Sequence, residues 1–192
     1  MRRTLILFAG LLISGLMYGQ SIPLVTIQQI NTAVDLAACN DTSVHLGDTV
    51  RFRAHVVTDG GLSEVASGSV QGGNRPFIYV IDTANMGVVD SASGMEIMGV
   101  YEDASGNLQP IPGFTALFQG DKIEVTGIFE QFDGNTQFTT LDVNSVTLLT
   151  SGDLMPSAFV PKVLTAGDLN DNQRVNNVQS GEWWQNSFVE LQ

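Results

Sequence analysis

The stretch 120–139 constrains the fold more than any other part of this sequence. Along residues 122–129 the side chains alternate with a period of two, which is typical of a half-buried strand. Asp133-Gly134-Asn135 then supplies residues that tolerate positive φ, as a tight hairpin connection requires. Residues 138–143 alternate again, so the stretch predicts a strand, a turn and a return strand.

Three more strands are expected before this hairpin, at about residues 48–58, 76–82 and 95–101. The first alternates along its length. Residues 76–82 are apolar at nearly every position, so their periodicity does not show which face is buried. Pro110 and Pro112 argue against a long helix between the third and fourth strands. Short strands separated by turn signals, without a convincing long helix, predict an all-β fold closed as a small five-stranded barrel.

The N-terminal residues 1–19 have the features of a secretory signal peptide. Arg2 and Arg3 give a positive start, residues 5–16 form an apolar stretch, and small Gly19 precedes the expected cut. A membrane anchor is the alternative, but the apolar run falls short of the ~20 residues that span a bilayer. We therefore expect a secreted or cell-surface protein with no membrane span after cleavage.

The chain is strongly acidic, with 8 Lys+Arg against 20 Asp+Glu. The leader holds two of the basic residues and none of the acidic ones, so the mature net charge is −14 (6 − 20). This charge repels polyanions, and no run of Lys or Arg builds the basic face that a nucleic-acid binder normally uses. Cys39 is the single cysteine, so no intrachain disulfide forms. It is either a small buried residue, or a thiol that pairs with another chain or is reactive.

The composition of the sequence changes after the last expected strand. Prolines and a polar run predict a linker at 151–180. Residues 181–192 contain both tryptophans and end in an alternating segment, which predicts the start of a truncated second β domain. The barrel domain then spans 20–150.

Four segments, taken in their order along the chain, resemble those of a known family. They are Gly47-Asp48-Thr49-Val50, Phe77-Ile78-Tyr79-Val80-Ile81-Asp82, Gly120-Asp121-Lys122-Ile123-Glu124-Val125-Thr126-Gly127 and Phe132-Asp133-Gly134-Asn135-Thr136-Gln137. The chain resembles an OB-fold module of bacterial secreted multidomain proteins. Similar modules precede the catalytic domain in extracellular nucleases of the endonuclease/exonuclease/phosphatase class. The tail also resembles the opening strand of a following module, as in multi-module surface proteins of Bacteroidota that end in a sorting domain. No catalytic set of such a nuclease is present, so the resemblance implies the fold rather than nucleic-acid binding.

The resemblance implies a ligand face on the outer side of the second and third strands, flanked by the loops after the first and fourth. The candidate ligand-binding residues are Arg51, Arg53, Phe77, Tyr79, Phe132 and Gln137. The aromatic side chains could stack on a base or a sugar, although residues such as Phe77 and Tyr79 more often belong to the core. The two arginines could contact an anion or pair with nearby carboxylates.

No catalytic constellation is evident in the sequence. His45 and His55 are the only histidines, and neither lies in a metal-binding or nucleophile motif. Residues 168–172 space oxygen atoms as an EF-hand loop does, but Gln173 and Gln179 replace its Gly and Glu, which favours a polar linker. We therefore expect no enzyme activity, no cofactor and no metal site in this chain.

Three functions remain open at this point. The first is a secreted, non-catalytic OB-fold accessory or interaction module of a larger extracellular protein. The second is a nucleic-acid-binding module of an extracellular nuclease whose catalytic domain lies downstream. The third is a carbohydrate-binding or structural spacer domain. The expected partners are an unknown ligand, nucleic acid or glycan among the options, and other domains of the same chain.

Overall fold

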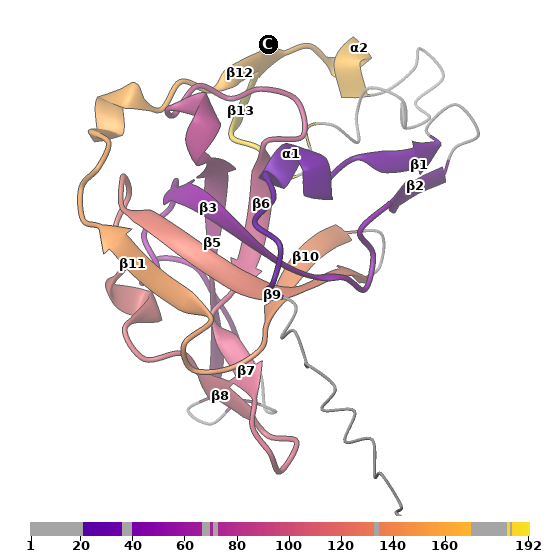
Figure 1. Cartoon of the computed structure of the whole chain (residues 1–192). Helices are drawn as coiled ribbons and strands as arrows, with labels where there is room; N and C mark the ends of the chain where they lie inside the picture. Colours follow the sequence, from indigo (N-terminus) through magenta and orange to yellow (C-terminus); the bar gives the residue numbers. More distant parts are fainter. Residues whose placement is uncertain are drawn as a thin grey trace, which may run out of the picture.

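The computed structural model describes residues 21–35, 40–66, 70, 73–132, 135–169, 184 and 186–192. The barrel strands are β3 (Thr49–Val56), β5 (Asn74–Asp82), β6 (Gly94–Met98), β9 (Lys122–Phe132) and β10 (Asn135–Thr140). They pair in the order β10-β6-β5-β3-β9, and β9 pairs with β10 again, so the ring closes (Figure 1). The β6–β10 pairing is parallel, whereas the others are antiparallel. This closed five-stranded arrangement confirms the predicted all-β, OB-like barrel.

The interior of the barrel is filled by the apolar half of each alternating strand. On β3 the side chains of Val50, Phe52 and Ala54 are buried, while those of Arg51 and Arg53 point away from the core. The rings of Phe52 and Phe138 meet edge to face, with centroids 4.8 Å apart. Burial of one such side chain contributes about 1.5–3 kcal/mol. The main core consists of Ile27, Ile30, Val50, Phe52, Ala54, Val56, Ile78, Val80, Met95, Ile97, Ile111, Phe114, Leu117, Ile123, Val125, Phe129 and Phe138.

The helix α1 (Ile27–Ile30) inserts two isoleucines into this core. Its N-cap Thr26 accepts a hydrogen bond from the Gln29 amide, and the Gln29 side chain accepts one from the Thr26 amide, which completes a capping box. The Ile27 amide donates to Asp82 Oδ2 at 2.7 Å. These contacts anchor α1 to the end of β5 and bury both isoleucines completely.

The third predicted strand, 95–101, is divided in two in the structure. β6 ends at Met98, and the short strand β7 (Val100–Glu102) pairs with β8 (Leu108–Pro110) instead of the barrel. Gly99 lies at the break, where an added Cβ would come 2.3 Å from the Phe114 ring. The chain turns here because only glycine lets Phe114, in the 3-10 helix Phe114–Ala116, approach so closely.

Smaller elements surround the barrel. β4 (Glu64–Ala66) pairs with β5, and β11 (Val146–Thr150) pairs with the first half of β9. β1 (Ala33–Asp35) and β2 (Asn40–Ser43) form a separate pair, and β12 (Lys162–Leu164) pairs in parallel with β13 (Val189–Leu191). The remaining elements are α2 (Ala166–Leu169) and the 3-10 helices Thr83–Asn85 and Pro156–Ala158.

The segment after β11 returns to the barrel. Phe159 and Leu164 are buried, and the amide of Leu154 donates to the Gly120 carbonyl at 3.0 Å. Residues 151–164 therefore lie against the barrel, although the predicted domain boundaries stay a prediction. The leader 1–19 and Cys39 lie outside the described residues. Within the described part of the chain, no helix is long and apolar enough to cross a membrane.

Candidate ligand-binding face

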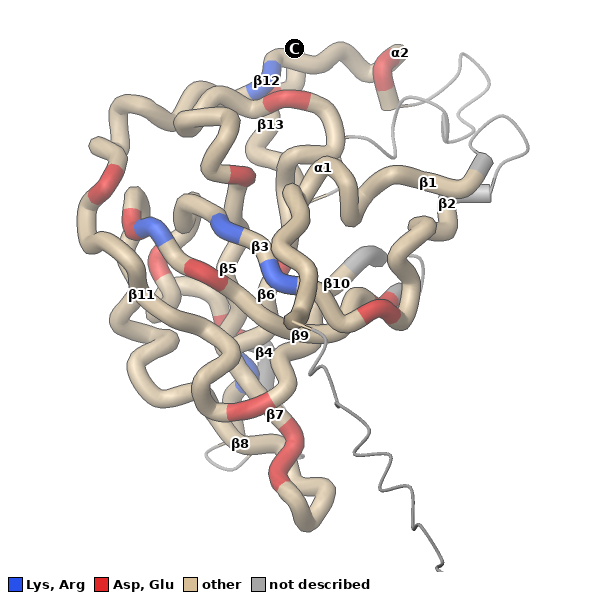
Figure 2. Tube along the Cα trace, in the orientation of Figure 1, with Lys and Arg blue, Asp and Glu red and all other residues tan. Residues whose placement is uncertain are grey.

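Arg51 and Arg53 share a single carboxylate on the outer side of β3. Arg51 Nη1 lies 3.2 Å from Glu124 Oε1, and Arg53 Nε lies 2.9 Å from Glu124 Oε2. Glu124 is opposite Arg53 in the β3–β9 register, so the strand pairing itself brings the three side chains together. Figure 2 shows these charges grouped over β3 and β9. The arrangement favours a role in pairing the two strands over a role in binding an anion.

His55 follows the arginines along the same side of β3 but is buried. Its Nε2 lies 2.8 Å from Asp153 Oδ2, and Lys122 Nζ lies 3.7 Å from the same oxygen. The hydrogen bond from His55, with the positive charge of Lys122, lowers the pKa of the Asp153 carboxyl below its usual 3.8. The contact joins the segment after β11 to the barrel.

Phe77 and Tyr79 lie together on the outer side of β5. Their rings meet edge to face with centroids 5.7 Å apart, and both side chains are only partly exposed. Phe77 packs against Met98 and Val100, and Tyr79 contacts a second apolar cluster. Burial, together with the charge of Glu96 and a hydrogen bond to it, raises the pKa of the Tyr79 phenol. Each ring therefore presents only part of its surface for stacking.

The strand registers place Gln137 in line with Tyr79. Tyr79 of β5 is opposite Glu96 of β6, and Glu96 is opposite Gln137 of β10. The structure thus brings two predicted residues onto one row of the outer surface, with a carboxylate between them. Arg51 and Arg53 lie apart from this row, on the β3–β9 pair. Phe132 ends β9, and its side chain lies outside the described part.

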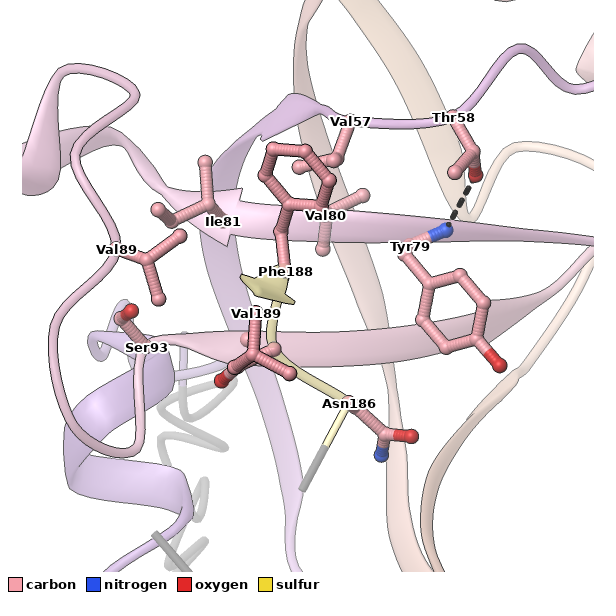
Figure 3. Close-up of a pocket in the computed structure, with 12 residues that line it drawn as sticks. Val57, Thr58, Tyr79, Val80, Ile81, Val89, Ser93, Asn186, Phe188 and Val189 are labelled. Carbon is pink, nitrogen blue, oxygen red and sulfur yellow. Dashed lines mark hydrogen bonds between the residues drawn. The ribbon is translucent and has the colours of Figure 1, made fainter. Parts of the chain in front are cut away.

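A cavity of about 350 Å³ lies on the outer side of β5 and β6, the second and third barrel strands (Figure 3). The barrel supplies one wall, through side chains that include Val57, Tyr79 and Ile81. The other wall comes from residues 186–189, which are distant in sequence and cross over these strands. Of the predicted ligand-binding residues, Tyr79 alone lines this cavity.

Gly94 permits the close contact between the two walls. A Cβ built at Gly94 would lie 2.3 Å from the Asn186 carbonyl oxygen and 2.8 Å from Ser187 Cα. Only a residue without a side chain lets the two backbones approach in this way. Val57, Ile81, Val89 and Phe159 form a buried apolar cluster beside the contact, and Leu154 and Trp184 pack against it.

None of the described residues that line the cavity has a charged side chain. Its polar groups include Thr58, whose Oγ1 accepts a hydrogen bond from the Tyr79 amide at 2.9 Å. Ser93 Oγ also lines it, and donates to the Asp90 carbonyl at 2.6 Å. Lys162 lies outside the lining, 5.5 Å from the ring centre of Trp184. The cavity is therefore neutral, although the chain as a whole is acidic.

Sequence reasoning missed Val57, Ile81, Gly94 and Phe188 as lining residues. One signal was present, because residues 76–82 are apolar on both faces. An outward side chain such as Ile81 is apolar because a second layer covers it, as its 2% exposure shows. The identity of that second layer could not be read from the sequence.

Among the described residues, no group of three or more His, Cys, Asp or Glu side chains could hold a metal ion. Asp168, the first residue of the EF-hand-like segment, accepts hydrogen bonds from the Thr165 amide and hydroxyl. These bonds lower the pKa of its carboxyl. The remaining residues of that segment, 170–172, lie outside the described part.

Comparisons with known proteins give limited information. No protein-family model matches the chain, and a search of curated proteins found no match. A structure assigned as an aspartyl-tRNA synthetase from Leishmania major Friedlin aligns with a TM-score of 0.41 and 12% identity, over 85% of this chain and 26% of that one. The second OB-fold domain of replication protein A from Methanococcus maripaludis aligns with a TM-score of 0.32 and 11% identity, over 54% of this chain and 86% of that one. The chain thus spans about a quarter of the synthetase, and at these scores neither likeness supports a functional argument.

Proposed function

We propose that this chain is a secreted, non-catalytic OB-fold module that serves as an accessory or interaction domain of a larger extracellular protein. Its binding surface is the outer face of β5 and β6. The observation that carries the proposal is the cavity of about 350 Å³ on that face, because ligand sites are typically concave and largely apolar. The carboxylates, histidines and arginines described above pair with one another instead of converging on a shared cleft.

Secretion is supported by the leader and by the composition. Residues 1–19 combine a positive start, an apolar stretch and a small residue at the expected cut. Expression of the full chain in a bacterial host should yield a mature protein that begins at Gln20, which intact-mass measurement of the exported fraction would show. A matched variant with Leu11→Arg and Leu12→Arg should remain uncleaved inside the cell. An uncleaved, cell-retained wild-type chain would overturn this part of the proposal.

A nucleic-acid-binding module is the second candidate, and the Phe77–Tyr79 pair on the outer face favours it. Base stacking on aromatic side chains is a common mode of single-strand binding. Three observations oppose it. The Glu96 carboxylate is hydrogen-bonded to Tyr79, and Arg51 and Arg53 both form ion pairs with Glu124. The chain also has a net charge of −12. A polyanion would meet repulsion at this surface.

A titration with single-stranded DNA distinguishes the two candidates. Fluorescently labelled oligothymidylate is added to the full chain at low salt, and we expect no saturable change in anisotropy. Saturable binding that weakens as salt is raised would establish the second candidate in place of the first. In that event Tyr79→Ala should weaken binding, and Phe118→Ala, an exposed aromatic outside the face, should leave it unchanged.

A further inference from the structure

The cavity beside β5 has the dimensions of a small-molecule site. Its volume of about 350 Å³ lies near the lower end of the range typical of ligand pockets, which is roughly 300–1,000 Å³. It is enclosed by two walls that come from different parts of the chain, the barrel strands and residues 186–189 (Figure 3). A compact molecule could therefore be held between them, whereas a polymer would have to displace the second wall.

The lining of the cavity disfavours a charged ligand. Val57, Ile81 and Val89 supply apolar surface from the barrel side, and Phe188 and Val189 supply it from the other wall. A charged group placed here would lose its hydration without meeting an opposite charge, which is strongly unfavourable. The raised pKa of Tyr79, caused first by burial, also keeps that phenol uncharged.

Among the described residues of the lining, Thr58 offers a directional contact to a ligand. Thr58 Oγ1 already accepts a hydrogen bond from the Tyr79 amide, which leaves the hydroxyl hydrogen to be donated. No described residue accepts this hydrogen. Ser93 differs, because its hydroxyl already donates to Asp90. A ligand with one acceptor atom could therefore be oriented toward Thr58, with its apolar part between Ile81 and Phe188.

We propose that this cavity binds a neutral, compact molecule with an aromatic ring and a single hydrogen-bond acceptor, and that residues 186–189 form part of the site. The proposal rests on the function proposed above, because it names the ligand class of the same face. It assigns Thr58 as the residue that orients the ligand. It assigns Phe188 as the aromatic residue that packs on the ring.

Acetophenone and benzoate form a matched pair of probes, since they share the ring and differ in a neutral carbonyl or an ionised carboxylate. Each is titrated into the isotopically labelled full chain and followed by amide NMR shifts. We expect acetophenone to shift Ile81, Gly94 and Phe188 saturably, and benzoate to bind roughly tenfold or more weakly. Equal affinity for the two probes, or shifts that avoid the cavity, would overturn the inference.

Variants then locate the site. Val89→Phe fills the cavity and should abolish the acetophenone shifts. Val88→Phe makes the same change one residue away, at a side chain that is 53% exposed and outside the lining, and should leave them intact. Unchanged binding by Val89→Phe, in a variant whose NMR spectrum remains dispersed, would contradict the proposed location.

Thr58 provides a second test if Val89→Phe does not fold. Thr58→Val keeps the shape of the side chain and removes the hydroxyl, which is both the donor to the ligand and the acceptor from the Tyr79 amide, and should weaken acetophenone binding about three- to tenfold. Thr58→Ser should restore it. Equal binding by Thr58→Val would overturn the role of Thr58. These outcomes are separate from those of the proposed function, which fails if the wild-type chain is not exported or if it binds oligothymidylate.

Discussion

Gly94 has no side chain, and this allows the two walls of the cavity to lie in close contact. Gly94→Ala would place a Cβ 2.3 Å from the Asn186 carbonyl oxygen, and the nearest atoms all belong to residues 186 and 187. We expect this variant to displace the second wall while the barrel stays folded. In a Trp183→Phe background, the emission of Trp184 should shift to the red, because Trp184 would lose its contact with the apolar cluster.

Gly167→Ala is the matched control for this variant. A Cβ at Gly167 would meet only Thr165 Oγ1 at 3.7 Å, an ordinary contact distance. Its emission should therefore equal that of the parent. An unshifted spectrum for Gly94→Ala would show that the backbones can separate slightly without releasing residues 186–189.

The pairing of Asp153 with His55 predicts how the free energy of unfolding changes in acid. Its folded-state pKa lies below 3.8, chiefly because His55 donates a hydrogen bond to it and Lys122 lies nearby. The stabilisation is therefore present above pH 3.8 and lost as the pH falls through the folded-state pKa. The difference in unfolding free energy between wild type and Asp153→Asn should be larger at about pH 5 than at about pH 2.5. Urea titration at both pH values measures it, and an equal difference would contradict the assignment.

Helix α1 shows how a very short element can matter to a barrel. Ile27 and Ile30 are completely buried, while Ile22, on the same segment, is 37% exposed. Ile27→Ala should therefore lower the free energy of unfolding by about 2–5 kcal/mol. Ile22→Ala should change it by less than about 1 kcal/mol. Denaturant unfolding of both variants checks this, and similar losses would mean that α1 is not part of the cooperative core.

Strands β3 and β9 could be predicted well from the sequence because each obeys a local rule. β3 and β9 both alternate, and both follow a Gly-Asp pair. Gly47 and Gly120 have positive φ, and both carboxylate oxygens of Asp121 accept hydrogen bonds, from Phe118, Ser151 and Gly152. In these segments the sequence pattern and the tertiary structure require the same residues.

The site was less predictable from the sequence, because its two walls come from segments that are far apart in the chain. The apolar residues of β5 leave its buried face undecided, and the structure explains why: the inner side faces the core and the outer side faces residues 159, 184 and 186–189. The pairing of Arg51 and Arg53 with Glu124 depends on the β3–β9 register. Such contacts between distant segments carry no periodic signal in the sequence.

The whole molecule depends on the closure of the barrel between β6 and β10. Phe138 of β10 is fully buried and packs edge to face on Phe52 of β3, across the interior. Phe138→Ala should lower the free energy of unfolding by about 3–5 kcal/mol. Phe118→Ala, at a side chain that is 59% exposed, should cost less than about 1 kcal/mol.

Denaturant unfolding followed by circular dichroism measures this effect. Wild type and Phe138→Ala should each unfold in a single transition, because a closed ring of strands unfolds as one unit. Separate transitions, or a small loss for Phe138→Ala, would show that closure contributes little to stability.

The two walls of the cavity also differ in when they are made. A ribosome releases the chain from its N-terminus, so every strand of the ring is synthesised before Asn186, Phe188 and Val189 exist. A nascent chain halted after β11 would contain all the barrel strands but only the barrel wall of the pocket. Ligand recognition would thus be acquired only after residues 186–189 have been synthesised, and occupancy of the pocket would mark a chain that has been translated through those residues.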